Sequence, residues 1–126
     1  MSRFMLALKA ITADKEKTET LIFDEIDSGI SGITAWKVAG SLAGVSRHHQ
    51  VICITHLPQI AAMADHHFMI VKSSDERSTT TDVIAAGDEG SIAEIARLLG
   101  TDSVSDSTLE NARELKDKAA AVKKAL

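Results

Sequence analysis

The chain has 126 residues and a mass of 13.5 kDa, which is enough for one ordinary domain and leaves little room for a second core. Hydrophobic residues make up 44% of the sequence and charged residues 25%, a globular composition that excludes disordered and fibrous classes. The formal charge of −4 provides no overall basic field, so any contact with DNA has to come from elsewhere.

The first half of the chain predicts alternating helices and strands. Apolar residues at helical spacing predict a helix over 2–13, and because no N-cap precedes it we expect its natural beginning to lie upstream. Thr20–Phe23 predicts a buried strand and Gln50–Thr55 a second one, with a helix between them that Ser31 caps. A short helix is expected over 57–64. This order of elements is typical of an α/β fold.

The second half of the chain predicts a β-hairpin and two helices. His67–Lys72 and Thr79–Ala85 flank a polar stretch and predict antiparallel strands. The capping-box spacing of serine and glutamate over 91–94, and again over 107–110, predicts the start of a helix at each place. The last helix has a narrow apolar seam, which we expect to dock on the chain's own domain rather than to form a zipper with a partner. The seam consists of Leu109, Ala112, Leu115, Ala119, Val122 and Leu126.

Two carboxylates, Asp24 and Glu25, directly follow the first predicted strand. Placing two adjacent carboxylates at the end of a buried strand costs free energy, so we expect them to serve a site. In a phosphate-transfer site of the P-loop kind, the first acid would hold Mg²⁺ through water, and the second would orient and deprotonate the attacking water. The alternative is an exposed acidic turn after a core strand, and the spacing alone favours neither interpretation.

A histidine, His56, follows the second predicted strand. Parallel neighbours place their carboxyl ends at one edge of a sheet, so we expect His56 to converge with Asp24 and Glu25. There it could contact a γ-phosphate or the hydrolytic water. A lone histidine is more often a structural residue with a hydrogen-bond partner, and that alternative stays open.

The remaining candidates are weaker. Neighbouring side chains diverge on a helix or strand, so the pairs His48-His49 and His66-His67 predict no metal site. Cys53, in a predicted strand, is expected to be a buried thiol, and as the only cysteine it fits a reducing, cytoplasmic compartment. No apolar stretch approaches the roughly 20 residues that cross a bilayer, so no membrane partner is expected.

Three segments carry a family resemblance: SRFMLALK from Ser2, FDEIDSGISG from Phe23 and CITHLPQIAAMADHH from Cys53. Together they closely resemble the C-terminal part of RecN, a family of bacterial DNA repair proteins in the SMC-like branch of the ABC ATPases. The resemblance covers essentially the whole chain. It implies a partial P-loop NTPase head, an α/β fold with mostly parallel core strands, a β-hairpin and C-terminal helices. Residues 1–126 would form a single domain that is a C-terminal fragment of such a head.

The resemblance implies roles for the residues at the predicted sheet edge. Asp24 matches the magnesium-associated Walker B acid, Glu25 the catalytic glutamate and His56 the switch histidine. The cofactors implied are ATP and Mg²⁺. The activity implied for the intact protein is ATP hydrolysis in double-strand-break repair and recombination.

The resemblance also implies contacts across a dimer of heads. Ser28, Gly29 and Ser31 match the D-loop, although Ser31 stands where most ABC ATPases have an aspartate. Ser2 and Arg3 resemble the end of the signature motif, whose preceding part would touch the γ-phosphate of the opposite head. The partners implied are a second head, the N-terminal half of the same head, and DNA in the intact, cytoplasmic and nucleoid-associated protein.

The phosphate-binding loop of such a head is absent from the sequence, because no G-x-x-x-x-G-K-[ST] occurs in the 126 residues. The long coiled coil of RecN-like proteins is absent as well. We therefore expect the isolated chain to expose an apolar strand edge and face, to self-associate, and to bind Mg²⁺-ATP weakly. The alternative function is a non-catalytic head-docking or scaffold module without ATP turnover.

Overall fold

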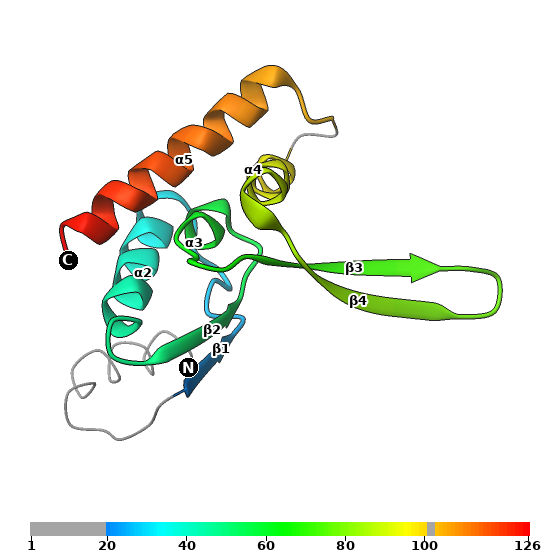
Figure 1. Cartoon of the computed structure of the whole chain (residues 1–126), viewed down its shortest axis with the longest axis horizontal. Coiled ribbons are helices and arrows are strands. Elements are labelled where there is room, and N and C mark those ends of the chain that lie inside the picture. Colours follow the sequence, from blue (N-terminus) through cyan, green and yellow to red (C-terminus); the bar gives the residue numbers. More distant parts are fainter. Residues whose placement is uncertain (1–19, 101–102) are drawn as a thin grey trace.

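The computed structural model describes residues 20–100 and 103–126 of the chain. The helix predicted over 2–13 and the candidate residues Ser2 and Arg3 lie outside these ranges. Figure 1 shows the helices gathered beside a short pair of strands, with a long hairpin extending away from them. The elements are β1 (Thr20–Asp24), α2 (Gly32–Val45), β2 (Gln50–Ile54), α3 (Pro58–Ala62), β3 (Phe68–Ser74), β4 (Thr79–Ala85), α4 (Gly87–Leu98) and α5 (Asp106–Lys124).

The first sheet consists of β1 and β2, which pair in parallel as predicted. On one face Leu21 and Phe23 are buried, whereas Ile22 on the other face is 68% exposed. The prediction of a buried strand is therefore right for one face of β1 and wrong for the other. The reason is that the described helices cover only one side of this sheet.

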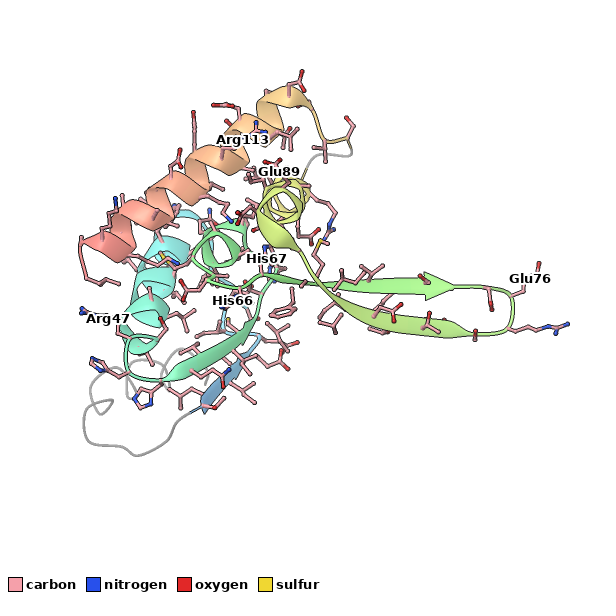
Figure 2. The ribbon with its side chains drawn as sticks, viewed as in Figure 1. Arg47, His66, His67, Glu76, Glu89 and Arg113 are labelled. Carbon is pink, nitrogen blue, oxygen red and sulfur yellow. The ribbon has the colours of Figure 1, made fainter. Side chains whose placement is uncertain are left out.

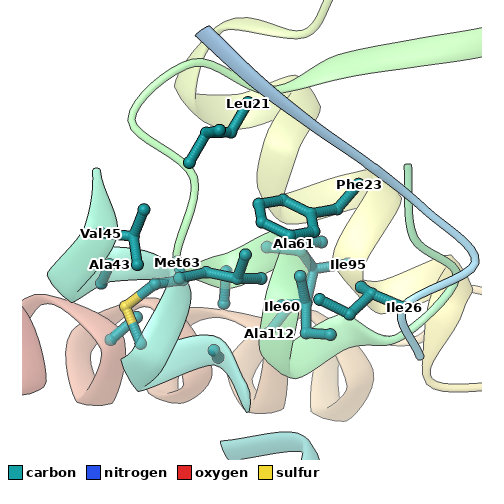
Figure 3. Close-up of a cluster of buried hydrophobic side chains, with 14 of the residues drawn as sticks. Leu21, Phe23, Ile26, Ala43, Val45, Ile60, Ala61, Met63, Ile95 and Ala112 are labelled. Atoms are coloured by element: carbon teal, nitrogen blue, oxygen red, sulfur yellow. The ribbon is translucent and has the colours of Figure 1, made fainter. Parts of the chain in front are cut away.

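The hydrophobic core lies between the covered face of this sheet and the helices (Figure 3). Large side chains such as Phe23, Ile26 and Ile95 fill its centre. Ala39 of α2 and Ala112 of α5 are fully buried, and such small residues let helix backbones approach closely. A core with few aromatic residues thus reaches close packing by combining branched aliphatic and small side chains.

The apolar seam of α5 docks on the chain's own core, as predicted. Ala112 and Ala119 are buried, and the larger seam residues between and beyond them are partly buried against the same cluster. The predicted seam extends one residue too far, because Leu126 lies beyond the end of α5 and is exposed. None of the described helices combines the length and apolarity that a membrane span needs.

The second sheet is the predicted antiparallel hairpin, with Phe68 of β3 opposite Ala85 of β4. Its turn is held by the carboxylate of Asp75, which accepts hydrogen bonds from the backbone N–H groups of Arg77 (2.9 Å) and Ser78 (2.7 Å). Both strands are exposed along almost their whole length, including the apolar residue Phe68, which is 58% exposed. Among the residues that the structure describes, the hairpin therefore touches the body of the molecule only near its base.

Helix α4 does not begin where the capping-box spacing predicted. It begins at Gly87, which has φ +63, a left-handed conformation that glycine adopts without steric penalty. Ser91 is buried inside the helix, where its hydroxyl binds the ring of His67 and receives a hydrogen bond from Lys116. The tertiary partners of Ser91 thus replace the local backbone partner that a capping box would have given it.

The N-caps of the other long helices lie close to the predicted positions. α5 is capped by Ser105 instead of Ser107, since the N–H of Thr108 donates to the Ser105 hydroxyl at 3.2 Å. Ser31 is the N-cap of α2, as predicted, in an extended conformation but without a side-chain capping hydrogen bond.

Candidate functional site

The acid pair lies where β1 ends. Asp24 is the last residue of the strand, Glu25 follows it, and both side chains are exposed. Glu25 has φ +55, a left-handed conformation that costs a residue with a Cβ about 1 to 2 kcal/mol. A tight turn follows at once, closed by a hydrogen bond of 3.2 Å from the Ser28 N–H to the Glu25 carbonyl. The chain therefore leaves the sheet directly at the two carboxylates.

The predicted D-loop residues continue this turn toward α2. Gly29 has φ +72, which again suits glycine, and the Ile30 N–H donates to the Asp27 carbonyl at 3.3 Å. Ser28, Gly29 and Ser31 are all exposed, and Ser31 leads into the first turn of α2. These residues thus form an open surface next to the acid pair.

The histidine predicted to join this edge, His56, follows β2 by two residues. Because Asp24 lies opposite Ile54 in the parallel register, the loops after both strands leave the same edge of the sheet. The His56 side chain is 72% exposed, and its ring Nδ1 lies 3.1 Å from Oδ2 of Asp27. The two loops are therefore linked by a residue that was not among the predicted candidates.

That residue, Asp27, has a side chain that is only 2% exposed. Its Oδ2 accepts hydrogen bonds from the hydroxyl of Thr55 at 2.5 Å and from the backbone N–H of His56 at 2.8 Å. Burial alone would raise the pKa of the Asp27 carboxyl, but these hydrogen bonds outweigh burial and lower its pKa. The Asp27 carboxylate is therefore ionised, and it lies beneath the sheet edge that carries the exposed acids Asp24 and Glu25.

The same network sets the start of α3. The Thr55 hydroxyl, besides donating to Asp27, accepts a hydrogen bond of 3.1 Å from the N–H of Leu57. Leu57 is the N-cap of α3, and Pro58 follows in the first turn, where its missing N–H is no loss. The Asp27 carboxylate therefore connects the turn after β1, the loop after β2 and the beginning of a core helix.

The sequence contains a signal for Asp27, although this residue was not predicted as part of the site. Three acids, Asp24, Glu25 and Asp27, occur within four positions, and only the first two continue the strand directly. Ile26 between them is 1% exposed and turns the chain back toward the core, which brings Asp27 inward with it. An apolar residue followed by an acid inside a polar turn is the pattern that would have indicated a buried carboxylate.

The thiol of Cys53 lies in β2 on the covered side of the sheet. Burial, together with the negative charges of Asp27 and Asp24, raises its pKa to about 11. The thiol stays protonated at neutral pH, but its side chain is partly buried rather than fully buried as predicted.

The residues present suit a magnesium ion better than a closed metal centre. Within 20–100 and 103–126, no three His, Cys, Asp or Glu side chains are grouped so that they could hold a metal. Mg²⁺, however, is bound through one or two carboxylates together with waters and substrate phosphates. The exposed carboxylate of Asp24 at the strand end fits that mode of binding.

A second polar cluster lies where the hairpin meets the helices; Figure 2 labels His66 and His67 there. Nδ1 of His67 lies 2.7 Å from the Ser91 hydroxyl, to which Lys116 of α5 also donates at 3.2 Å. A cavity of about 260 Å³ opens beside this cluster. The three side chains tie the base of the hairpin to α4 and α5.

No family model matches the chain, but curated proteins do. It is 45% identical over 115 residues to the DNA repair protein RecN of Vibrio cholerae, and 46% identical over 115 residues to that of Treponema pallidum. It is 43% identical over 123 residues to the DNA repair protein RecN of Halalkalibacterium halodurans. These matches cover 91%, 91% and 98% of this chain but only 21%, 20% and 22% of the relatives. The chain spans about one fifth of the length of the curated relatives it matches.

Proposed function

Since the chain is homologous over nearly its whole length to the C-terminal part of the RecN DNA repair proteins, we propose that it supplies one half of an ATP-hydrolysing head of the SMC-like kind. The head would serve DNA double-strand-break repair and recombination in the complete cytoplasmic protein. The observation that carries this proposal is the parallel register of β1 and β2, with Asp24 opposite Ile54. It makes the loops bearing Asp24, Glu25 and His56 leave one edge of the sheet.

Each of these three residues has a distinct proposed role. Asp24 would hold Mg²⁺, through water, and that ion when bound to ATP offsets the charge of the phosphates. Glu25, exposed at the start of the turn, would accept a proton from the attacking water. His56 would contact the γ-phosphate or that water with its exposed ring.

The uncovered face of the β1–β2 sheet supports completion of the head by another segment. Parallel sheets are covered on both faces, whereas Ile22, Ile52 and Ile54 are exposed on the face away from the helices. The N-terminal half of the head, with the phosphate-binding loop, would cover this face. A second head would then meet the D-loop residues Ser28, Gly29 and Ser31, and Ser2 and Arg3 would belong to the surface facing its nucleotide.

The test is the substitution Glu25→Gln in a complete RecN-type protein that carries these residues. Glutamine keeps the shape and hydrogen-bonding reach of the side chain but removes the base, so kcat for ATP should fall by about 10²- to 10⁴-fold. The affinity for ATP should change little. Asp24→Asn, in contrast, should also weaken Mg²⁺-dependent nucleotide binding.

Steady-state ATPase assays and nucleotide titrations distinguish the alternatives. Turnover by Glu25→Gln within about threefold of the parent would remove Glu25 from the role of base. A parent protein that binds its partners but hydrolyses no ATP would favour the other candidate function, a non-catalytic head-docking or scaffold module.

A further inference from the structure

We propose that Asp27 is a positioning residue for His56: it holds the Nδ1–H of the ring and leaves Nε2 as the hydrogen-bond acceptor that orients the attacking water. This inference rests on the proposed function of the β1–β2 edge and adds to it a buried residue to which no role has been given. It also chooses between the two contacts open to His56, the γ-phosphate and the water.

The direction of the hydrogen bond between the two residues follows from the charge of the carboxylate. An ionised carboxylate has no proton to donate, so a ring nitrogen 3.1 Å from Oδ2 of Asp27 binds it by carrying the hydrogen itself. In the neutral imidazole only one nitrogen is protonated, and if that is Nδ1, then Nε2 has a free lone pair. The position of a buried carboxylate thus selects the tautomer of an exposed histidine.

Several hydrogen bonds to one oxygen hold His56 in place. Oδ2 of Asp27 binds His56 twice, through the ring and through the backbone N–H at 2.8 Å, so the residue is held at both its backbone and its side chain. Thr55 donates to the same oxygen and fixes the preceding residue. The ring is nevertheless 72% exposed, and a ligand can therefore reach it at the edge where β1 and β2 end.

The tautomer of His56 determines which hydrogen bonds its ring can make to the reactants. A neutral ring with a free Nε2 lone pair accepts a hydrogen bond from water and cannot donate one to a phosphate oxygen at that nitrogen. The water held in this way gives its other proton to Glu25, and its oxygen attacks the γ-phosphorus while the bond from that phosphorus to the bridging oxygen breaks and ADP leaves. A carboxylate that fixes the tautomer and orientation of a histidine is the arrangement of the serine hydrolases, where the carboxylate does not itself take up the proton.

The competing explanation is that Asp27 only ties the two loops together. Asp27→Ala separates the two, because it removes Oδ2, the single oxygen that accepts from Thr55, from the His56 N–H and from the ring. Asp27→Asn would not serve, because an amide oxygen in the place of Oδ2 still accepts all three hydrogen bonds. The ring of the alanine variant should therefore lose the Nδ1–H tautomer in favour of Nε2–H, the form that predominates in a free neutral imidazole. A purely structural role predicts no such change between the parent and the variant.

The first measurement is the tautomer of His56 by nitrogen-detected NMR of the 126-residue chain, with His56→Gln to assign the signals. The parent should show Nδ1–H, Asp27→Ala should show mainly Nε2–H, and the matched loss of a carboxylate in Glu25→Gln should leave the tautomer unchanged. Nε2–H in the parent, or an unchanged tautomer in Asp27→Ala, would overturn the proposal. If Asp27→Ala does not fold, the tautomer of the parent alone decides.

The second measurement is ATP turnover by the complete RecN-type protein with Asp27→Ala. We expect kcat to fall by about 10- to 100-fold, the size of effect seen when the outer hydrogen-bond partner of a metal-bound histidine is lost, with KM for ATP within about twofold. A reversed tautomer with kcat within about threefold of the parent would overturn the role in the reaction. Failure of the proposed function would show separately, as unchanged turnover in Glu25→Gln, while the NMR result on Asp27 remained valid.

Discussion

The molecule contains two sheets of two strands each within its described residues, and they differ in what surrounds them. β1 and β2 place one face on the core, so that Phe23 is 5% exposed, and their following loops share the buried Asp27 carboxylate. β3 and β4 are longer and fully paired, yet Phe68 near the base of that hairpin is 58% exposed. Pairing of backbones is thus equally complete in both sheets, while burial of side chains is confined to one.

This contrast explains why the candidate site lies on β1 and β2 rather than on the hairpin. A hairpin with both faces open is marginal by itself, because hydrogen bonds between strands replace those to water and add little net free energy. The β1–β2 pair is held by apolar burial and by a charged hydrogen-bond network, so it can present exposed carboxylates in fixed positions. The candidate site lies on the sheet that the core supports.

The strongest test of this comparison is to remove the same side chain from each sheet. Phe23→Ala should lower the free energy of unfolding by about 3 to 5 kcal/mol, because it leaves a cavity in the core. Phe68→Ala should lower it by less than about 1 kcal/mol, because its ring is mostly in water already. Urea denaturation followed by circular dichroism measures both. Equal losses would show that the hairpin is packed as firmly as β1.

A second pair compares the two carboxylates that stabilise turns. Asp27→Ala leaves the Thr55 hydroxyl and the His56 N–H without their buried acceptor, and should cost about 2 to 4 kcal/mol. Asp75→Ala removes an acceptor from two N–H groups of the hairpin turn that water can satisfy instead, so its effect should be much smaller. The same denaturation experiment applies. A larger loss of stability for Asp75→Ala would contradict the conclusion that the Asp27 carboxylate connects the two loops and the beginning of α3.

The sequence predicted the strands well because their patterns depend on local residues. Apolar runs between polar turns located β1, β2 and the hairpin to within one or two residues, and the parallel pairing followed from the helix between β1 and β2. The capping box at Ser91 failed because a tertiary contact competed with it: the hydroxyl binds His67 and Lys116, which are distant in sequence. The exposure of Ile22 could not be predicted either, since it depends on which segments cover the sheet.

The candidate site was predictable only in part. The placement of Asp24, Glu25 and His56 after neighbouring parallel strands followed from topology, and the register agrees with it. Asp27 was missed because the predicted site included only the acids that directly follow the strand, and the apolar residue before Asp27 was not taken as a sign that this acid faces inward. That direction is set by Ile26, which is buried, and by the donors of the neighbouring loop, which lie 28 and 29 residues away along the chain.

A third prediction concerns the uncovered face of β1 and β2. The isolated chain should self-associate through this face, because its apolar residues are held in place by the core below and lose little freedom on contact. Ile22→Lys should weaken association by at least about tenfold, as expected when a buried isoleucine contact is replaced by a charge. Val83→Lys on the hairpin is the matched control and should have a smaller effect. A parent chain that sediments as a sharp monomer at all concentrations would contradict this expectation.

The smallest effect we predict separates the two sheets by pH. Burial, helped by the positive charge of Lys116 and opposed by Glu94, lowers the pKa of His67 below its usual 6.5, so the folded chain binds this proton less tightly than the unfolded chain. The stability that His67 contributes at the hairpin base is therefore complete above about pH 7 and declines as the pH falls through 6.5 toward the lower folded pKa.

The lowered pKa of Asp27 acts in a different window, since its contribution is complete above the ordinary value of 3.8 and is lost only as the pH falls below it. Between about pH 7.5 and about pH 5.5 the urea midpoint should therefore fall less in His67→Gln than in the parent, because glutamine does not titrate. Asp27→Asn should retain the decline seen in the parent over this interval. If His67→Gln shows the same decline as the parent, the histidine is not the group that weakens the hairpin base in mild acid, and the two sheets do not differ in their response to pH in this way.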